Sequence, residues 1–119
     1  MEKVNIPQKL ALFSDYWNPR IVGKLNGQQV KLVKFKGPFT WHKHHEEDEL
    51  FYVVSGQFNM EFRDRTVTLN EKEFLIVPRG VEHRPVADKE VAVMLFEPAS
   101  TVNTGNVMND LTRTNLESI

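Results

Sequence analysis

Short apolar segments that end at turn residues recur along most of the chain, and they constrain its fold more than any other feature. The clearest turn is Asn26-Gly27, which separates segments 20–25 and 28–36 and is the dipeptide most typical of a two-residue β-hairpin. Other breaks contain Gly, Pro, Ser or Asp. Short strands joined by such turns predict an all-β fold, an antiparallel sandwich or barrel.

The expected strands fill the middle of the chain. Gly37-Pro38 is expected to end the second strand, and Asp88-Lys89 is expected to separate the last two. The predicted strands are 20–25, 28–36, 39–44, 49–54, 57–62, 66–69, 74–77, 83–87 and 90–97.

The segment 91–96, Val-Ala-Val-Met-Leu-Phe, has no polar side. Such a strand is covered on both faces, by the barrel interior on one and by another sheet or subunit on the other. We therefore expect a homodimer formed through a sheet face.

A chain of 119 residues fits one compact domain and leaves no room for a second. Folding at this size buries about two-thirds of the surface, so a core forms without disulfides or a structural metal. We expect the barrel to comprise residues 20–97.

The two ends of the chain differ from its middle. Residues 1–19 are expected to form an arm, as a short helix or an edge strand, in which Leu10, Leu12 and Phe13 pack onto the barrel. The tail 98–119 is polar and rich in Asn and Thr, and we expect it to wrap the surface or fray.

Composition excludes several classes of function. Fifteen Lys and Arg against sixteen Asp and Glu give a net charge of −1, so neither nucleic acid nor a membrane surface is an expected partner. The absence of cysteine excludes disulfides, thiolate metal sites and a cysteine nucleophile. The start of the chain lacks the apolar core of a secretory signal, and no apolar run could span a bilayer. We expect a cytoplasmic protein, although a mature secreted chain without cysteine would look the same.

The histidines are unusually placed. His42 and His44 are one residue apart, so in a strand they project from the same face, while His45 points the other way. A third histidine, His83, follows the turn Pro78-Arg79-Gly80. Together with a carboxylate these imidazoles would form an all-N/O cluster suited to one divalent transition metal.

Glu49 is the candidate carboxylate. It ends the acidic run 46–49, which is ordinarily a solvated loop, but it also begins an apolar strand and can share the inward face with Phe51 and Val53. From the residues alone, a metal site and a set of ordinary surface residues explain the pattern equally well.

Two motifs resemble those of the cupins. Gly37-x4-His42-x-His44-x4-Glu49-x6-Gly56, within residues 37–56, is similar to the first cupin motif. Pro78-x-Gly80-x2-His83, within residues 72–87, is similar to the second. The resemblance implies a double-stranded β-helix, or jelly-roll barrel, with a metal held inside one end. It also implies the metal ligands His42, His44, Glu49 and His83.

The chain departs from the family pattern at three places. Four residues separate Gly37 from His42, where the family usually has five. Lys72 stands where a glycine normally opens the second motif, and Ala87 stands where an asparagine is expected. These departures concern turns and packing, and none removes a ligand.

Three imidazoles and one carboxylate suit Fe, Mn, Ni, Co, Cu or Zn as the divalent metal, and the sequence does not select among them. Four protein ligands on an octahedral ion leave two positions open for water, substrate or dioxygen. Side chains on the ligand-bearing faces would make an apolar pocket for a small, partly hydrophobic ligand, although each alone fits ordinary core. They are Thr40, Phe51, Val53, Phe58, Met60 and Phe62.

Two classes of function follow. The first is a metal-dependent enzyme that acts on a small molecule, dioxygenase-like or isomerase-like, for which no catalytic acid or base is assigned. The second is a non-catalytic metal-containing module that binds or senses a small molecule.

Overall fold

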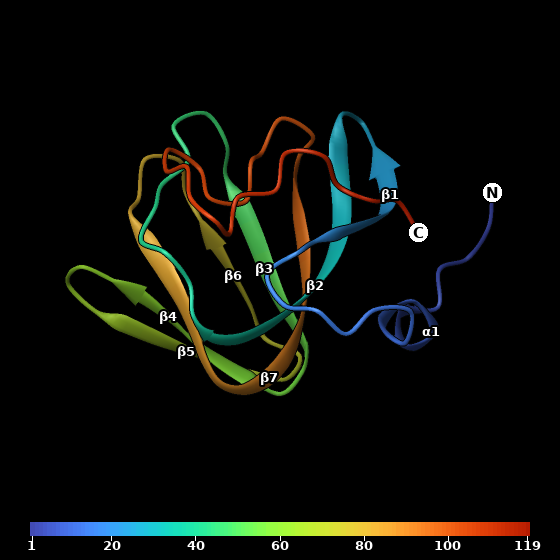
Figure 1. Ribbon diagram of the computed structural model, residues 1–119, viewed down its shortest axis with the longest axis horizontal. Helices are drawn as coiled ribbons and strands as arrows, with labels where there is room; N and C mark the ends of the chain where they lie inside the picture. The colour runs from blue at the N-terminus through green and yellow to red at the C-terminus, as the bar shows by residue number, and fades with distance from the viewer.

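The computed structural model describes residues 1–119 and contains one short helix and seven strands. They are α1 (Ile6–Leu10), β1 (Arg20–Leu25), β2 (Gln28–Pro38), β3 (Glu49–Ser55), β4 (Gln57–Phe62), β5 (Thr66–Asn70), β6 (Phe74–Val77) and β7 (His83–Pro98). All strand pairs are antiparallel, and the strands curve into a jelly-roll barrel (Figure 1). The predicted all-β fold is therefore confirmed. No helix of the chain has the length and apolar character needed to span a membrane.

The strand β7 joins the two halves of the barrel. Its first part pairs with β4 and its second part with β3, while β2 pairs with both parts. Residues 88–90 form a bulge opposite Lys36, and this bulge lets β7 bend as it passes from one partner to the next. The predicted turn at Asp88-Lys89 is wrong, because these exposed polar residues belong to the bulge of one continuous strand.

The region after β2 also differs from the prediction. β2 continues through Gly37 to Pro38, and the positive φ of Gly37, +78°, suits the bulged pairing there. The segment 39–44 is not a strand: it pairs only through an isolated bridge between His42 and His83. The other expected strands end where the observed strands end or one residue earlier.

Lys72 keeps the backbone conformation of the glycine that it replaces in the second motif. Its φ is +68°, in the left-handed region that glycine favours. For a residue with a side chain, adopting this conformation costs about 1–2 kcal/mol relative to the right-handed one. The surrounding turn holds it there, since the Lys72 amide donates to the Val53 carbonyl at 2.8 Å.

Aromatic stacking closes one end of the barrel. Trp17 stacks on Phe35 and Phe39 with ring centroids 4.4 and 4.6 Å apart, and its Nε1 donates to the Lys36 carbonyl at 3.1 Å. The ring of Phe35 also meets Phe58 of β4 edge-on. The arm therefore contributes a core residue that links β2 to the segment that carries the histidines.

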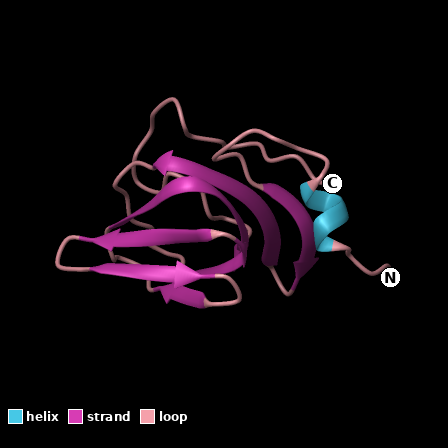
Figure 2. Ribbon diagram, turned by 90° about the horizontal axis from the view of Figure 1, so that it is seen from below, coloured by secondary structure: helices cyan, strands magenta, loops and turns pink.

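The rest of the arm lies outside the barrel. α1 sits at one end of the molecule, opposite the projecting β4–β5 hairpin (Figure 2). Phe13 is buried and Leu10 half-buried, as expected, but Leu12 is 67% exposed, so its predicted packing is wrong. One turn of helix is too short to bury every apolar side chain of the segment.

The tail crosses the end of the barrel and returns to β1 (Figure 1). The Ile21 amide donates to the Glu117 carbonyl at 2.9 Å, and the Ile119 amide donates to the Ile21 carbonyl at 3.0 Å. Its last residues thus form an isolated parallel bridge between Ile21 and Ser118.

Replacing Trp17 by alanine tests the closure of the barrel end. We expect Trp17→Ala to lower the free energy of unfolding by about 3–5 kcal/mol, because it leaves a cavity between two aromatic rings. Urea denaturation measures the change. Leu12→Ala is the control and should stay within about 0.5 kcal/mol of the original chain. A loss below about 1 kcal/mol for Trp17→Ala would contradict this account.

Candidate metal centre

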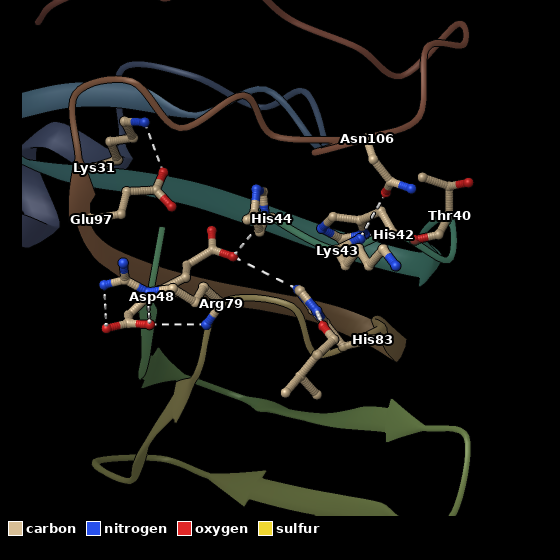
Figure 3. A network of polar contacts seen from close by, with 12 residues as sticks. Lys31, Thr40, His42, Lys43, His44, Asp48, Arg79, His83, Glu97 and Asn106 are labelled. Carbon is tan, nitrogen blue, oxygen red and sulfur yellow. Dashed lines mark hydrogen bonds and ion pairs between the residues drawn. The ribbon is translucent and has the colours of Figure 1, made fainter. Parts of the chain in front are cut away.

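Four buried side chains meet at the same end of the barrel. His42 and His44 come from the loop between β2 and β3, Glu49 begins β3, and His83 begins β7. One ligand atom of each lies within 4.8 Å of the others. Figure 3 shows the rings of His42, His44 and His83 directed toward one another. All four are at most 4% exposed.

Backbone hydrogen bonds bring the two motifs together. The His42 amide donates to the His83 carbonyl at 3.1 Å, and the His83 amide donates to the His42 carbonyl at 2.9 Å. The Gly80 amide donates to the His44 carbonyl at 2.7 Å. The Asp48 carboxylate accepts from the Arg79 amide at 2.9 Å. Residues that are distant in the sequence are therefore held in register without a continuous strand.

Two histidines are oriented in the same way. His42 Nδ1 lies 2.9 Å from the Thr40 carbonyl, and His83 Nδ1 lies 2.9 Å from the Val81 carbonyl. A carbonyl oxygen only accepts, so each Nδ1 carries the proton in the neutral ring, and each Nε2 keeps a free lone pair. This is the arrangement by which a backbone carbonyl orients a metal-binding imidazole.

Several atoms of the cluster are buried without a hydrogen-bond partner. They are both ring nitrogens of His44, Nε2 of His83 and Oε1 of Glu49. Glu49 Oε1 lies 3.2 Å from His44 Nε2 and 3.7 Å from His83 Nε2. An unsatisfied buried polar atom costs about 1–3 kcal/mol, and one bound cation would satisfy the donors directed at it. The residues therefore fit a divalent transition metal.

The protonation states also suit a metal. Burial, together with the nearby His83, lowers the pKa of His42 to about 4, so this ring is neutral at pH 7. Burial by itself would raise the pKa of Glu49, but the polar side chains of Glu97, His44 and His83 beside it hold that pKa well below its ordinary value. A neutral imidazole and an anionic carboxylate are the forms that ligate metals.

Behind Glu49 lies a buried ion pair that the sequence did not predict. Lys31 Nζ of β2 lies 2.7 Å from Glu97 Oε1 of β7, and both side chains are 2% exposed (Figure 3). Burial and the charge of Glu49 raise the pKa of Glu97 well above its ordinary value. With the pKa of Glu97 raised and that of Glu49 lowered, Glu97 is the one of the two carboxyl groups that takes up a proton more readily. Strand periodicity could have found both residues, because Glu97 follows Val93 and Leu95 on the inward face of β7.

A small apolar cavity of about 30 Å³ adjoins the cluster. His42, Glu49 and Phe51 line it together with Trp17 of the arm and Asn103 of the tail. Phe51 is the only member of the predicted pocket set on its wall. Val53, Phe58 and Met60 are core, Phe62 packs partly buried against that core, and Thr40 contributes its carbonyl to His42.

The family model that matches this chain is described as the cupin domain, and it covers residues 31–97. The chain belongs to the cupin family. The matched stretch contains both motifs and the whole candidate metal cluster.

Similar cupin-fold structures cover most of the chain. A cupin-2 domain-containing protein from Shewanella frigidimarina NCIMB 400 is 42% identical, with a TM-score of 0.79 over 80% of this chain and 93% of that chain. Protein NMB1881 from Neisseria meningitidis is 34% identical, with a TM-score of 0.76 over 82% of this chain and all of that chain. The uncharacterized protein YdbB of Bacillus subtilis strain 168 is 36% identical over 64 residues, which span 53% of this chain and only 57% of that protein.

The arginines near His83 do not face the cluster of this cupin. Arg79 pairs with Asp48, and the guanidinium of Arg84 pairs with Glu61. His45 is exposed, as expected for a residue out of phase with the ligands. The site is therefore made of its four donors and apolar walls.

The lowered pKa of His42 predicts how stability depends on pH in the metal-free protein. Between its folded pKa of about 4 and its ordinary value of 6.5, the unfolded chain takes up a proton that the folded chain does not. The contribution of His42 to the free energy of unfolding is therefore fully present above pH 6.5 and is lost as the pH drops toward 4. His42→Gln removes the effect, so from pH 7 to pH 4.5 the variant should gain about 2–3 kcal/mol relative to the original chain.

Urea denaturation in the presence of a chelator, at both pH values, measures this difference. Wild type and variant are compared at each pH because Glu49 and Glu97 titrate in both proteins. A difference that does not change with pH would show that His42 is not held neutral.

Proposed function

We propose that this cupin binds one divalent transition metal through His42, His44, Glu49 and His83 and acts with it as an enzyme on a small molecule. The observation that carries the proposal is the set of buried, unpartnered donor atoms that converge within 4.8 Å. A metal held there would supply Lewis acidity or the activation of dioxygen.

The chain's own residues prepare the site for such chemistry. The Thr40 and Val81 carbonyls fix the tautomers of two imidazoles, and the lowered pKa of Glu49 keeps its carboxylate anionic. Aromatic walls from Phe39 and Phe51 exclude bulk water, which strengthens electrostatic interactions inside the site.

Oxygen chemistry fits the cavity better than isomerisation. An isomerase needs an acid or base within hydrogen-bond reach of the substrate. Apart from His42 and Glu49, which serve as ligands, no titratable side chain lines the cavity. Its volume of about 30 Å³ is enough to hold a molecule as small as water or dioxygen.

The lack of an acid or base on the cavity wall also supports a second candidate, a non-catalytic metal-containing module that binds or senses a small molecule. Both candidates need the metal, and they differ in turnover. If removing the metal with a chelator abolishes a measured turnover, the result supports the enzyme. Full metal binding with no turnover across a broad substrate screen supports the module.

The metal and the reaction are tested together on protein purified without added metal. Elemental analysis should give about one equivalent of one transition metal per chain, and His44→Ala should retain less than a tenth of it. Oxygen uptake by the Fe(II)-loaded protein with candidate substrates, measured against His44→Ala, then tests catalysis. His45→Ala is the matched control, because His45 is exposed and should leave metal content unchanged. Equal metal content in His44→Ala and the original chain would refute the site.

We also propose that two copies of the chain associate through the outer face of β6, β3 and β7. Phe74 and Ile76 of the edge strand β6 are 61% and 52% exposed. Cross-strand pairing aligns them with Tyr52 and Leu50 of β3, and then with Met94 and Phe96 of β7, on one sheet face. A contiguous apolar face of this kind is typical of an interaction surface.

Ile76→Glu tests this association. Sedimentation velocity should show a dimer for the original chain and a monomer for the variant, because the new carboxylate would be desolvated in the interface. Leu12→Glu, on the exposed arm, should remain dimeric. A monomeric original chain would contradict the proposal.

A further inference from the structure

Part of the tail, residues 101–113, is an ordered cover over the histidine loop. Thr104 is completely buried, and its hydroxyl donates to the Val107 carbonyl at 2.6 Å and lies 2.7 Å from the Thr112 hydroxyl. The Asn103 amide group closes the segment on itself, since Oδ1 accepts from the Arg113 amide at 2.8 Å and Nδ2 donates to the Leu111 carbonyl at 2.9 Å. The segment therefore has a defined shape of its own.

The cover binds the one residue that stands between two candidate ligands. The Lys43 amide donates to Asn106 Oδ1 at 2.9 Å, and the Asn106 amide donates to the Lys43 carbonyl at 3.0 Å. Figure 3 shows Asn106 reaching Lys43 beside His42. This reciprocal pair holds both peptide groups of Lys43, and these peptides connect it to His42 and His44.

Gly105 brings the cover unusually close to the loop. A Cβ at this position would lie 2.2 Å from the Lys43 carbonyl oxygen and 3.2 Å from His42 Cδ2. Its φ of +56° is also one that glycine adopts without strain. Any side chain here would push the cover away from the histidine loop.

The same segment forms one wall of the cavity. Asn103 lines it beside His42 and Glu49, and its Nδ2 also lies 3.5 Å from the Trp17 carbonyl of the arm. The cover thus connects the loop that carries two candidate ligands with the residue that closes the barrel end.

We propose that residues 103–106 are a positioning clamp for the metal centre, in which Asn106 and Gly105 fix the backbone between His42 and His44. The clamp rests on the proposed metal-binding function. It acts on the ligands through Lys43 and touches neither the metal nor a substrate. When the clamp is released, the two imidazoles lose their common orientation and the metal leaves faster.

The test measures metal release and loop protection in the full chain. Zn²⁺-loaded Asn106→Ala and Gly105→Ala should lose zinc to a chelating dye at least about tenfold faster than the original protein. The Lys43 amide, followed by hydrogen exchange, should also exchange about tenfold faster in Asn106→Ala, because its acceptor is gone. Asn106→Asp keeps an acceptor oxygen and should restore slow release. Asn115→Ala, an exposed asparagine of the same tail, is the matched control and should match the original chain.

The outcomes separate the clamp from a general loss of stability. Faster release with an unchanged urea midpoint supports the clamp. The clamp is overturned if the rates of zinc release in both variants, and of Lys43 amide exchange in Asn106→Ala, stay within about twofold of those of the original chain. It is also overturned if a fall in the urea midpoint accounts for the faster release. If the original chain binds no zinc, the proposed function fails, and Lys43 exchange in Asn106→Ala alone decides whether the tail holds the loop.

Discussion

The structure depends on burying three imidazoles and a carboxylate at the end of an apolar barrel. Buried atoms of His44, Glu49 and His83 lack hydrogen-bond partners, and each such atom costs about 1–3 kcal/mol. The fold tolerates this cost because β7 pairs with three other strands and Trp17 packs between two aromatic rings. A ligand bound at a thousand times its dissociation constant adds about 4 kcal/mol, which is enough to offset much of the deficit.

The same constraint explains the groups behind the site. Glu49 stays anionic in the barrel because its neighbours Glu97, His44 and His83 hold its pKa low, and Lys31 pairs with the second carboxyl, Glu97. Removing one member of such a buried pair leaves an uncompensated charge, which is why the three groups form a unit. The site therefore reaches from the histidine loop through Glu49 to the opposite strands β2 and β7.

The sequence predicted most strand ends, because hairpin turns and period-two alternation are local signals, and its resemblance to the two cupin motifs implied all four members of the cluster. It failed where tertiary contacts decide the local structure. The polar pair Asp88-Lys89 reads as a turn, yet pairing with β2 on both sides makes it a bulge. Segment 39–44 alternates like a strand, yet only His42 finds a β partner. The cover by Gly105 and Asn106 has no sequence signal, since it depends on where the tail crosses the barrel.

The central claim is that His42, His44, Glu49 and His83 hold one metal together. X-ray absorption of the stoichiometrically zinc-loaded protein tests it most directly, because it counts the imidazoles on the ion. The account predicts three imidazole nitrogens at about 2.0–2.1 Å and at least one oxygen at about 2.0–2.2 Å. Fewer than three imidazoles in the first shell, or no stoichiometric zinc at all, would contradict it.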